Sequence, residues 1–311
     1  MSTAYYSHSD CRLHDMGRGH PECPERLDAI EDHLIAQRLL DVLDRRVAPR
    51  VDVADLGRAH AAAYVARIAD VLQTVATTGE SVALDPDTVA GPGTWNAALR
   101  AAGAAVAATD AVIDRDVANA FCAVRPPGHH ATRDTAMGFC FLNNVAVAAR
   151  HALDVRGLER VAIVDFDVHH GNGTEDIIAG DERILMVSIF QHPLYPYSGA
   201  VPLGPNMVNV PVPPYSRGPE VRELIEANWM PRLEAFRPQM LFVSAGFDAH
   251  REDDLGQLGL VEADYEWITR KVKDVADRHA QGRIVSCLEG GYNLGALARS
   301  VAAHLRVLAG V

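Results

Sequence analysis

A chain of 311 residues, of which 48% are hydrophobic and 23% charged, is long enough for one large globular domain with a substantial core. Its formal net charge of -12 argues against a general nucleic-acid-binding protein and is compatible with a cationic substrate, such as a lysine-containing peptide or a polyamine. Because the sequence has no apolar run of about 18 residues and no charged-then-apolar leader, we predict no membrane span and expect a cytoplasmic location.

Strands and helices are predicted to alternate along the chain. Short β-branched and apolar runs predict strands over residues 3–8, 118–124, 161–164, 183–189, 240–244 and 283–288. Apolar residues at helical spacing predict helices from Pro24, over residues 95–113, 143–153, 219–235 and 262–279, and from Leu294. Alanine-rich helical stretches are also expected between the first of these helices and about Thr77. Residues 14–25, 78–93 and 190–205 are predicted to be loops. The alternation predicts a single α/β domain over residues 1–311, with a mostly parallel central sheet flanked by helices in three layers.

The most informative stretch is residues 161–174, VAIVDFDVHHGNGT. Side chains alternate along an extended segment, so Asp165, Asp167 and His169 are expected to project to one side. Two carboxylates and an imidazole suit zinc or another first-row divalent metal. The competing interpretation is a solvated turn, but so many polar groups directly after a buried strand favour a metal or catalytic role.

Polar side chains also follow other predicted strands. His129 and His130 lie on a stiff Arg-Pro-Pro-Gly loop, where they resemble placed acid/base groups. Asp248 follows the strand at 240–244, and Tyr292 follows the strand at 283–288 after two glycines. In open α/β sheets, ligands bind and reactions occur at the carboxyl ends of the strands, so these groups are candidate active-site residues.

Taken together, these motifs closely resemble the zinc-dependent histone deacetylase family of the arginase/deacetylase fold, in its class II-like bacterial branch. The matching segments occur in the family's order over nearly the whole chain: 20–26 (HPECPER), 125–130 (RPPGHH), 138–143 (GFCFLN), 165–174 (DFDVHHGNGT), 244–248 (SAGFD) and 289–292 (EGGY).

The resemblance implies a zinc hydrolase. Its ligands would be three residues: Asp167, His169 and Asp248. By the same resemblance, His129 and His130 would transfer protons, with Asp165 and Asn172 as their respective hydrogen-bond partners. Tyr292 would donate a hydrogen bond to the oxyanion. A carboxylate stabilises an imidazolium and an amide does not, so the two histidines are expected to differ in basicity. Which of them is the general base is left open.

The resemblance also implies a narrow tunnel for an acylated lysine. Six residues are assigned to it: Gly138, Phe139, Tyr195, Asp85, Leu255 and Gly291. Phe139 and Tyr195 would form two aromatic walls around the methylene chain, although the family usually has Phe at the position of Tyr195. Asp85 would be the acid at the rim that holds the substrate backbone. Arg26 matches an arginine near the internal channel for released acetate.

A structural potassium ion is a further expectation from the resemblance. Its ligands would be the backbone carbonyls of Asp165, Asp167 and His169 together with Ser188. The expected cofactors are therefore Zn²⁺ and K⁺.

Three alternatives are weighed against an acyl-lysine deacetylase. A two-metal ureohydrolase needs further aspartates where this chain has Gly171 and His250, so one zinc is favoured. An acetylpolyamine deacetylase can place a glutamate where this chain has Leu255, yet Asp253 and Asp254 keep that substrate class open. A non-catalytic binding module usually lacks one of the ligands, histidines or tyrosine, all of which are present. The expected partner is an acylated lysine protein or peptide, or an acetylated polyamine, with no nucleic acid and no membrane; the sequence leaves an oligomer open.

Overall fold

The computed structural model describes residues 1–311, and eight of its strands form one central sheet. The order across the sheet is β2-β1-β5-β10-β9-β6-β7-β8, and every neighbouring pair is parallel. The strand bounds are β1 Thr3–Ser7, β2 Leu43–Val47, β5 Asn119–Cys122, β6 Val161–Asp165, β7 Ile184–Gln191, β8 Met207–Val212, β9 Leu241–Ala245 and β10 Ile284–Leu288. A separate antiparallel pair is formed by β3 Val82–Ala83 and β4 Val89–Ala90.

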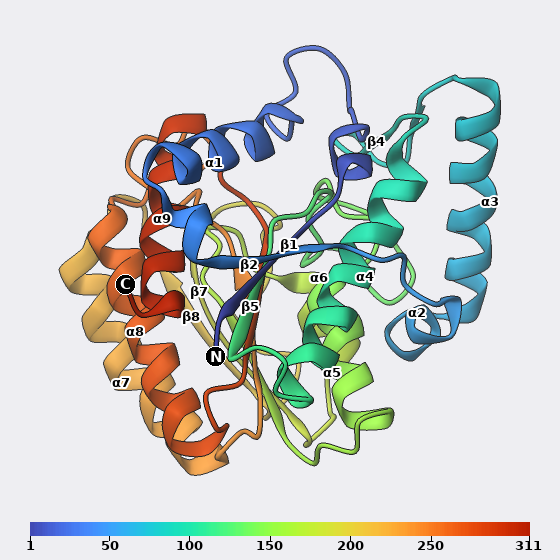
Figure 1. Ribbon diagram of the computed structural model, residues 1–311. Helices are drawn as coiled ribbons and strands as arrows, with labels where there is room; N and C mark the ends of the chain where they lie inside the picture. The colour runs from blue at the N-terminus through green and yellow to red at the C-terminus, as the bar shows by residue number, and fades with distance from the viewer.

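Helices cover both faces of the sheet (Figure 1). One layer contains α1 Glu25–Ala36, α7 Gly218–Phe236, α8 Glu262–His279 and α9 Leu294–Ala309. The other contains α2 Val53–Ala59, α3 Ala62–Thr78, α4 Thr94–Ile113, α5 Asn144–Asp154 and α6 Asn172–Ile178. The predicted three-layer α/β architecture with a parallel central sheet is therefore confirmed. No helix is both long enough and apolar enough to cross a membrane.

The strands at the centre of the sheet are apolar because helices cover them on both sides. All residues of β5, β6, β9 and β10 are buried. The alanine-rich helix α4 approaches its neighbours closely: a Cβ at Gly103 would lie 2.1 Å from the carbonyl oxygen of Pro49. The result is one hydrophobic core that runs through the whole sheet.

The expected helices and strands all occur, with bounds close to those expected, but the structure adds short elements. The added strand β2 has the sequence LDRRV, in which polar residues dominate because it lies at the edge of the sheet. The added strand β8 lies at the other edge and contains Pro211, which a central strand would not tolerate. Helix α6 begins at Asn172, within the glycine-containing motif at 165–174, and β3 and β4 lie within the expected loop at 78–93.

The parallel arrangement brings four loops to one edge of the sheet. β5, β10, β9 and β6 are consecutive neighbours, and Asp165 at the end of β6 is in register with Ser244 of β9. Cys287 of β10 is in register with both Ser244 and Cys122, the last residue of β5. The segments that follow these strands therefore emerge side by side, and they carry the predicted site residues.

Candidate active site

Three potential metal ligands meet where β6 and β9 end. Asp167 and His169 lie just after β6, and Asp248 lies just after β9. One ligand atom from each residue lies within 4.8 Å of the other two. Nδ1 of His169 is 3.1 Å from Oδ1 of Asp167 and 3.1 Å from Oδ2 of Asp248. The structure thus brings together the three residues for which zinc binding was predicted.

This cluster has both the chemistry and the space of a metal site. Two carboxylates and an imidazole suit zinc, and three protein ligands leave a coordination position for water or substrate. Gly290 forms a close wall: a Cβ there would lie 2.0 Å from Oδ2 of Asp248 and 2.6 Å from Oδ2 of Asp167. Burial and the charge of Asp167 raise the pKa of Asp248 to about 7. A cation among these crowded carboxylates would relieve their mutual repulsion, so the residues fit zinc.

The positions that would supply a second metal do not join the cluster. Gly171 has no ligand atom, and His250 accepts the backbone N–H of Glu252 at its Nδ1, at 3.2 Å. His250 is not among the residues of the cluster. The expected exclusion of a two-metal ureohydrolase site thus has a geometric basis.

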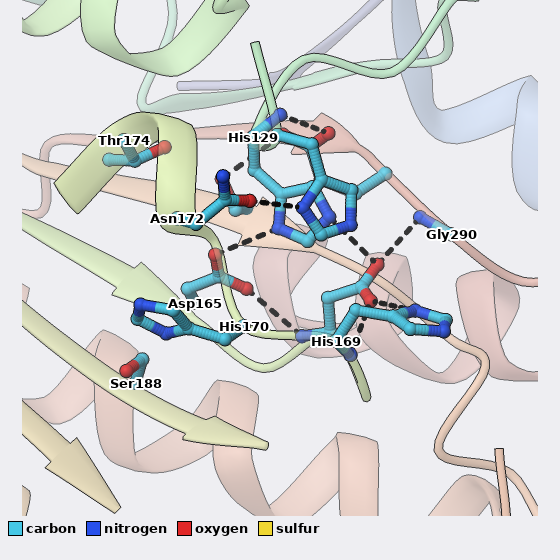
Figure 2. Close-up of polar contacts among 12 residues, drawn as sticks. His129, Asp165, His169, His170, Asn172, Thr174, Ser188 and Gly290 are labelled. Atoms are coloured by element: carbon cyan, nitrogen blue, oxygen red, sulfur yellow. Dashed lines mark hydrogen bonds and ion pairs between the residues drawn. The ribbon is translucent and has the colours of Figure 1, made fainter. Parts of the chain in front are cut away.

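The tandem histidines have different hydrogen-bond partners (Figure 2). Nδ1 of His129 lies 3.0 Å from Oδ2 of Asp165, and Nδ1 of His130 lies 2.7 Å from Oδ1 of Asn172. Because an amide oxygen can only accept, His130 carries its proton on Nδ1 and keeps a free lone pair on Nε2. The two imidazole centroids are 4.0 Å apart.

These surroundings separate the basicities of the two imidazoles, as predicted. Burial favours the neutral form of His129, but the carboxylates of Asp167 and Asp165 outweigh it and raise the pKa of His129 to about 10. Burial, with the neighbouring charges of His129 and His169, holds the pKa of His130 well below its usual value. These surroundings therefore favour the charged form of His129 and the neutral form of His130.

A cavity of about 230 Å³ opens beside the cluster. Its lining residues are Asp87, His130, Gly138, Phe139, His169, Leu194, Tyr195, Tyr197, Leu255 and Tyr292. The ring centroids of Phe139 and Tyr292 are 5.9 Å apart, and those of His130 and Tyr195 are 5.2 Å apart. The cavity is thus a mostly apolar slot with aromatic walls, and His130 and Tyr292 are part of its lining.

Glycines next to this slot allow close approach. A Cβ at Gly138 would lie 2.5 Å from Cδ2 of His130, and its φ of +55° is one that glycine adopts at little cost. Gly291 does not line the cavity; its carbonyl accepts from Nε of Arg26 at 2.6 Å. The Arg26 guanidinium carbon also lies 5.1 Å from the ring centroid of Tyr292. Arg26 therefore holds the turn that presents Tyr292.

Asp87 lines the cavity, whereas Asp85, the acid predicted to hold the substrate backbone, does not. Oδ1 of Asp85 accepts the backbone N–H groups of Asp87 and Thr88, at 2.9 and 2.7 Å, so Asp85 shapes the loop from within. Asp87 lines the cavity, and burial together with the charge of Asp85 raises its pKa to about 6. Sequence reasoning missed Asp87 because the two acids are two residues apart and only the loop conformation separates their roles.

Two further acids that had no assigned catalytic role support the site from behind. Oε2 of Glu289 accepts the backbone N–H groups of Gly128 and His129, at 2.6 and 3.1 Å. Oδ2 of Asp253 accepts the backbone N–H groups of Tyr292 and Asn293, at 2.6 and 2.9 Å. The signal for Glu289 was a charge directly after a buried strand; Asp253 had no local signal.

The predicted potassium ligands lie near one another but remain a prediction. Asp165 and Ser188 are register partners in β6 and β7. The hydroxyl of Ser188 donates to Oδ1 of Asn209 at 3.4 Å, and its carbonyl accepts from the indole of Trp229 at 3.2 Å. Figure 2 shows Ser188 on the far side of His170 from Asn172.

Comparisons with known proteins agree with this geometry. The histone deacetylase domain model matches residues 20–308. The chain is 39% identical over 282 residues to the histone deacetylase-like amidohydrolase of Pseudomonas aeruginosa, covering 88% of this chain and 73% of that protein. It is 35% identical over 309 residues to a probable deacetylase of Archaeoglobus fulgidus, with 96% and 83% covered. The crystal structure of the HDA15 HD domain matches with a TM-score of 0.93 and 33% identity, covering 100% of this chain and 89% of that one. The chain therefore belongs to the histone deacetylase family.

Proposed function

We propose that this protein is a zinc-dependent amidohydrolase that removes acetyl or other acyl groups from the ε-amine of lysine in proteins or peptides. The observation that carries the proposal is a single arrangement: a buried Asp-His-Asp cluster beside a narrow aromatic cavity that also presents His130 and Tyr292. An aromatic slot accepts the methylene chain of a lysine without requiring charge. The Asp-His-Asp cluster would then lie beside the acyl amide of that lysine.

The three cluster residues Asp167, His169 and Asp248 would hold the zinc ion. When bound, zinc supplies Lewis-acid activation of a water molecule and of the amide carbonyl. His130 lines the cavity with a free Nε2, so it is the group that we propose accepts the proton of the attacking water. His129, oriented by its hydrogen bond with Asp165, would in its protonated form stabilise developing negative charge and supply a proton toward the leaving amine.

Tyr292 would donate the hydrogen bond to the oxyanion. Burial, with the charge of Asp248, raises the pKa of Tyr292 well above its ordinary value, so the phenol stays a donor at neutral pH. Arg26, Glu289 and Asp253 would act as positioning residues for the two loops that carry His129 and Tyr292. A hydrogen-bond donor that is held in place in this way stabilises the negative charge that develops on the carbonyl oxygen in the transition state.

An acetylpolyamine deacetylase is the second candidate, and Asp87 is the observation that favours it. A carboxylate in the lining of the cavity would attract a second ammonium on the substrate. Against it, Leu255 in the cavity lining is apolar. The carboxylate of Asp253 already accepts three backbone N–H groups, including that of Leu255 at 3.1 Å. A non-catalytic module is disfavoured because every residue of the proposed machinery is present.

The test is a rate comparison of the zinc-loaded protein on an acetyl-lysine peptide and on acetylated spermidine, with a hydroxamate chelator as the control. Faster, hydroxamate-sensitive hydrolysis of the peptide is expected. Faster hydrolysis of the polyamine would transfer the proposal to the second candidate, and no hydrolysis of either would refute both.

The structural potassium ion and a cytoplasmic location remain predictions, and an oligomer remains open.

A further inference from the structure

A second cavity, of about 500 Å³, lies at the same edge of the sheet as the catalytic cavity. We call it the basic groove; its principal lining residues are Tyr215, Arg217, Arg251, Gly256 and Gln257. It is formed between the loop after β8 and the loop after β9. Backbone hydrogen bonds join these loops: Tyr215 N–H donates to the carbonyl of Gln257 at 2.8 Å, and Gly259 N–H donates to that of Ser216 at 2.8 Å. The groove is therefore framed by fixed backbone.

The groove carries positive charge without a compensating acid. Arg217 and Arg251 are both exposed and neither forms an ion pair, and no aspartate or glutamate lines the groove. Other arginines nearby are paired: Arg222 with Asp264, and Arg299 with Glu252 and Glu262. These two guanidinium groups therefore form a local positive patch in a chain with a formal net charge of -12.

The acids around the groove do not neutralise it. Glu220 receives the backbone N–H of Arg217, at 2.6 Å, rather than its guanidinium. Glu252 is committed to Arg299, at 2.8 Å. Asp254 is exposed and lies in the same loop, but it is not part of the lining. The two guanidinium groups are therefore available to an external carboxylate, for which the arginine fork is geometrically suited.

The lining of the basic groove borders that of the catalytic cavity. Leu255 lines the catalytic cavity and Gly256, the next residue, lines the groove, so their Cα atoms are about 3.8 Å apart. Gly256 packs against the backbone of Asp248, a residue of the Asp-His-Asp cluster, since a Cβ there would lie 2.6 Å from the carbonyl oxygen of Asp248. The N–H of Gln257 donates at 2.7 Å to Oε1 of Gln191, the last residue of β7, whose following loop carries Tyr195.

We propose that the basic groove binds an acidic side chain of the peptide substrate, close in sequence to the acylated lysine. This inference rests on the proposed function and narrows it to lysine in an acidic sequence context. An extended peptide advances about 3.3–3.6 Å per residue, so residues adjacent to a lysine seated in the catalytic cavity reach the groove. Tyr215, with 73% of its side chain exposed, adds a ring surface for the same segment. A polyamine has no carboxylate, so the groove favours a peptide substrate.

The experiment measures kcat/KM for acetyl-lysine peptides that carry a single Glu, Gln or Lys at successive positions on either side of the acetyl-lysine. For the wild-type protein we expect Glu to exceed Gln by about two- to fivefold per ion pair formed, mainly through KM. Lys at the same position should be poorer than Gln. The advantage of Glu should shrink at high ionic strength, because exposed charges are screened.

The variants identify the groups responsible. In the double variant Arg217→Gln/Arg251→Gln, the ratio of Glu to Gln should fall to about one. Arg50→Gln is the matched control, since Arg50 is also exposed and unpaired but follows β2, at the opposite edge of the sheet from β8; it should keep the wild-type ratio. Melting temperatures of all variants are measured to verify folding.

The outcomes separate this inference from the proposed function. If wild-type protein hydrolyses the peptides but shows no preference for Glu at any position, or if the double variant keeps the preference, the groove assignment is wrong and the proposed function stands. If none of the peptides is hydrolysed while acetylated spermidine is, the proposed function fails and the groove's role fails with it.

Discussion

Glu22 is predicted to be among the most stability-critical side chains, although it binds neither metal nor substrate. It is fully buried, and its carboxylate accepts from Nε and Nη2 of Arg125 and from Nη1 of Arg26; Nε2 of His14 lies 3.3 Å away. Burial alone would raise the pKa of Glu22, but Arg125, His14 and Arg26 outweigh it and hold that pKa well below its usual range.

The substitution Glu22→Gln keeps the shape and removes the charge. It leaves two buried guanidinium groups, on Arg26 and Arg125, without a counter-ion, so we expect the free energy of unfolding to fall by about 3–5 kcal/mol. Because Arg26 also holds the carbonyl of Gly291 beside Tyr292, turnover should fall as well. The assay is equilibrium unfolding in urea at pH 7, followed by tryptophan fluorescence. The matched control is Glu234→Gln, whose partly exposed carboxylate pairs with Arg278 and His279 and should contribute about 0–1 kcal/mol.

The pH dependence of the same variant provides an independent check. A carboxyl group with a depressed pKa in the folded state stabilises the fold above its ordinary pKa, and that contribution is lost as the pH falls below about 4.5. The stability difference between wild type and Glu22→Gln should therefore be constant near neutral pH and should shrink in acid. Equal losses for Glu22→Gln and Glu234→Gln, or a difference independent of pH, would refute the reasoning.

Four further predictions concern the site and the core. Asp167→Ala should remove bound zinc together with activity, as measured by metal analysis and turnover; an active, zinc-loaded variant would contradict the ligand assignment. Tyr292→Phe should keep zinc but lose roughly 2–4 kcal/mol of transition-state stabilisation, seen in kcat/KM, and normal turnover would exclude the oxyanion role. Asp253→Asn should keep zinc, lose about 1.5–3 kcal/mol of stability in urea unfolding and lower turnover, because the turn of Tyr292 loses a charged acceptor; unchanged turnover would count against its positioning role. Burial lowers the pKa of His304 to about 3, so the unfolded chain takes up the proton first as the pH falls below about 6.5; between pH 7 and pH 5 wild type should lose about 2 kcal/mol more than His304→Asn, and parallel pH profiles would contradict this.

Much of the fold was predictable because each central element has a clear local pattern. β6 is a continuous apolar run since it is buried on both faces, and α8 has apolar residues at helical spacing since only one side of it packs on the core. The edge strands β2 and β8 were not predicted, because an exposed edge accepts polar residues and proline that weaken the pattern. The short helix α6 was hidden by the glycines of its own motif.

By itself, the sequence determined the chemical groups of the site and the strands that carry them. Asp167, His169, Asp248 and the tandem histidines could be named in advance because they lie in segments that follow buried strands and match the motifs of the family that the chain resembles. These residues converge because the sheet is parallel, and the alternation of strands and helices in the sequence already predicts a parallel sheet.

Only the tertiary structure decided which of several similar acids serves which purpose. Asp85 and Asp87 look alike in sequence, yet the loop turns one inward to its own backbone and the other into the cavity. Asp253 was a candidate for reading a polyamine until its carboxylate was found bound to the backbone of Tyr292. The basic groove joins Arg217 and Arg251 from loops far apart in the chain. The physical reason is the same in each case: the direction of a side chain on a loop depends on long-range hydrogen bonds and packing, which leave no periodic trace in the sequence.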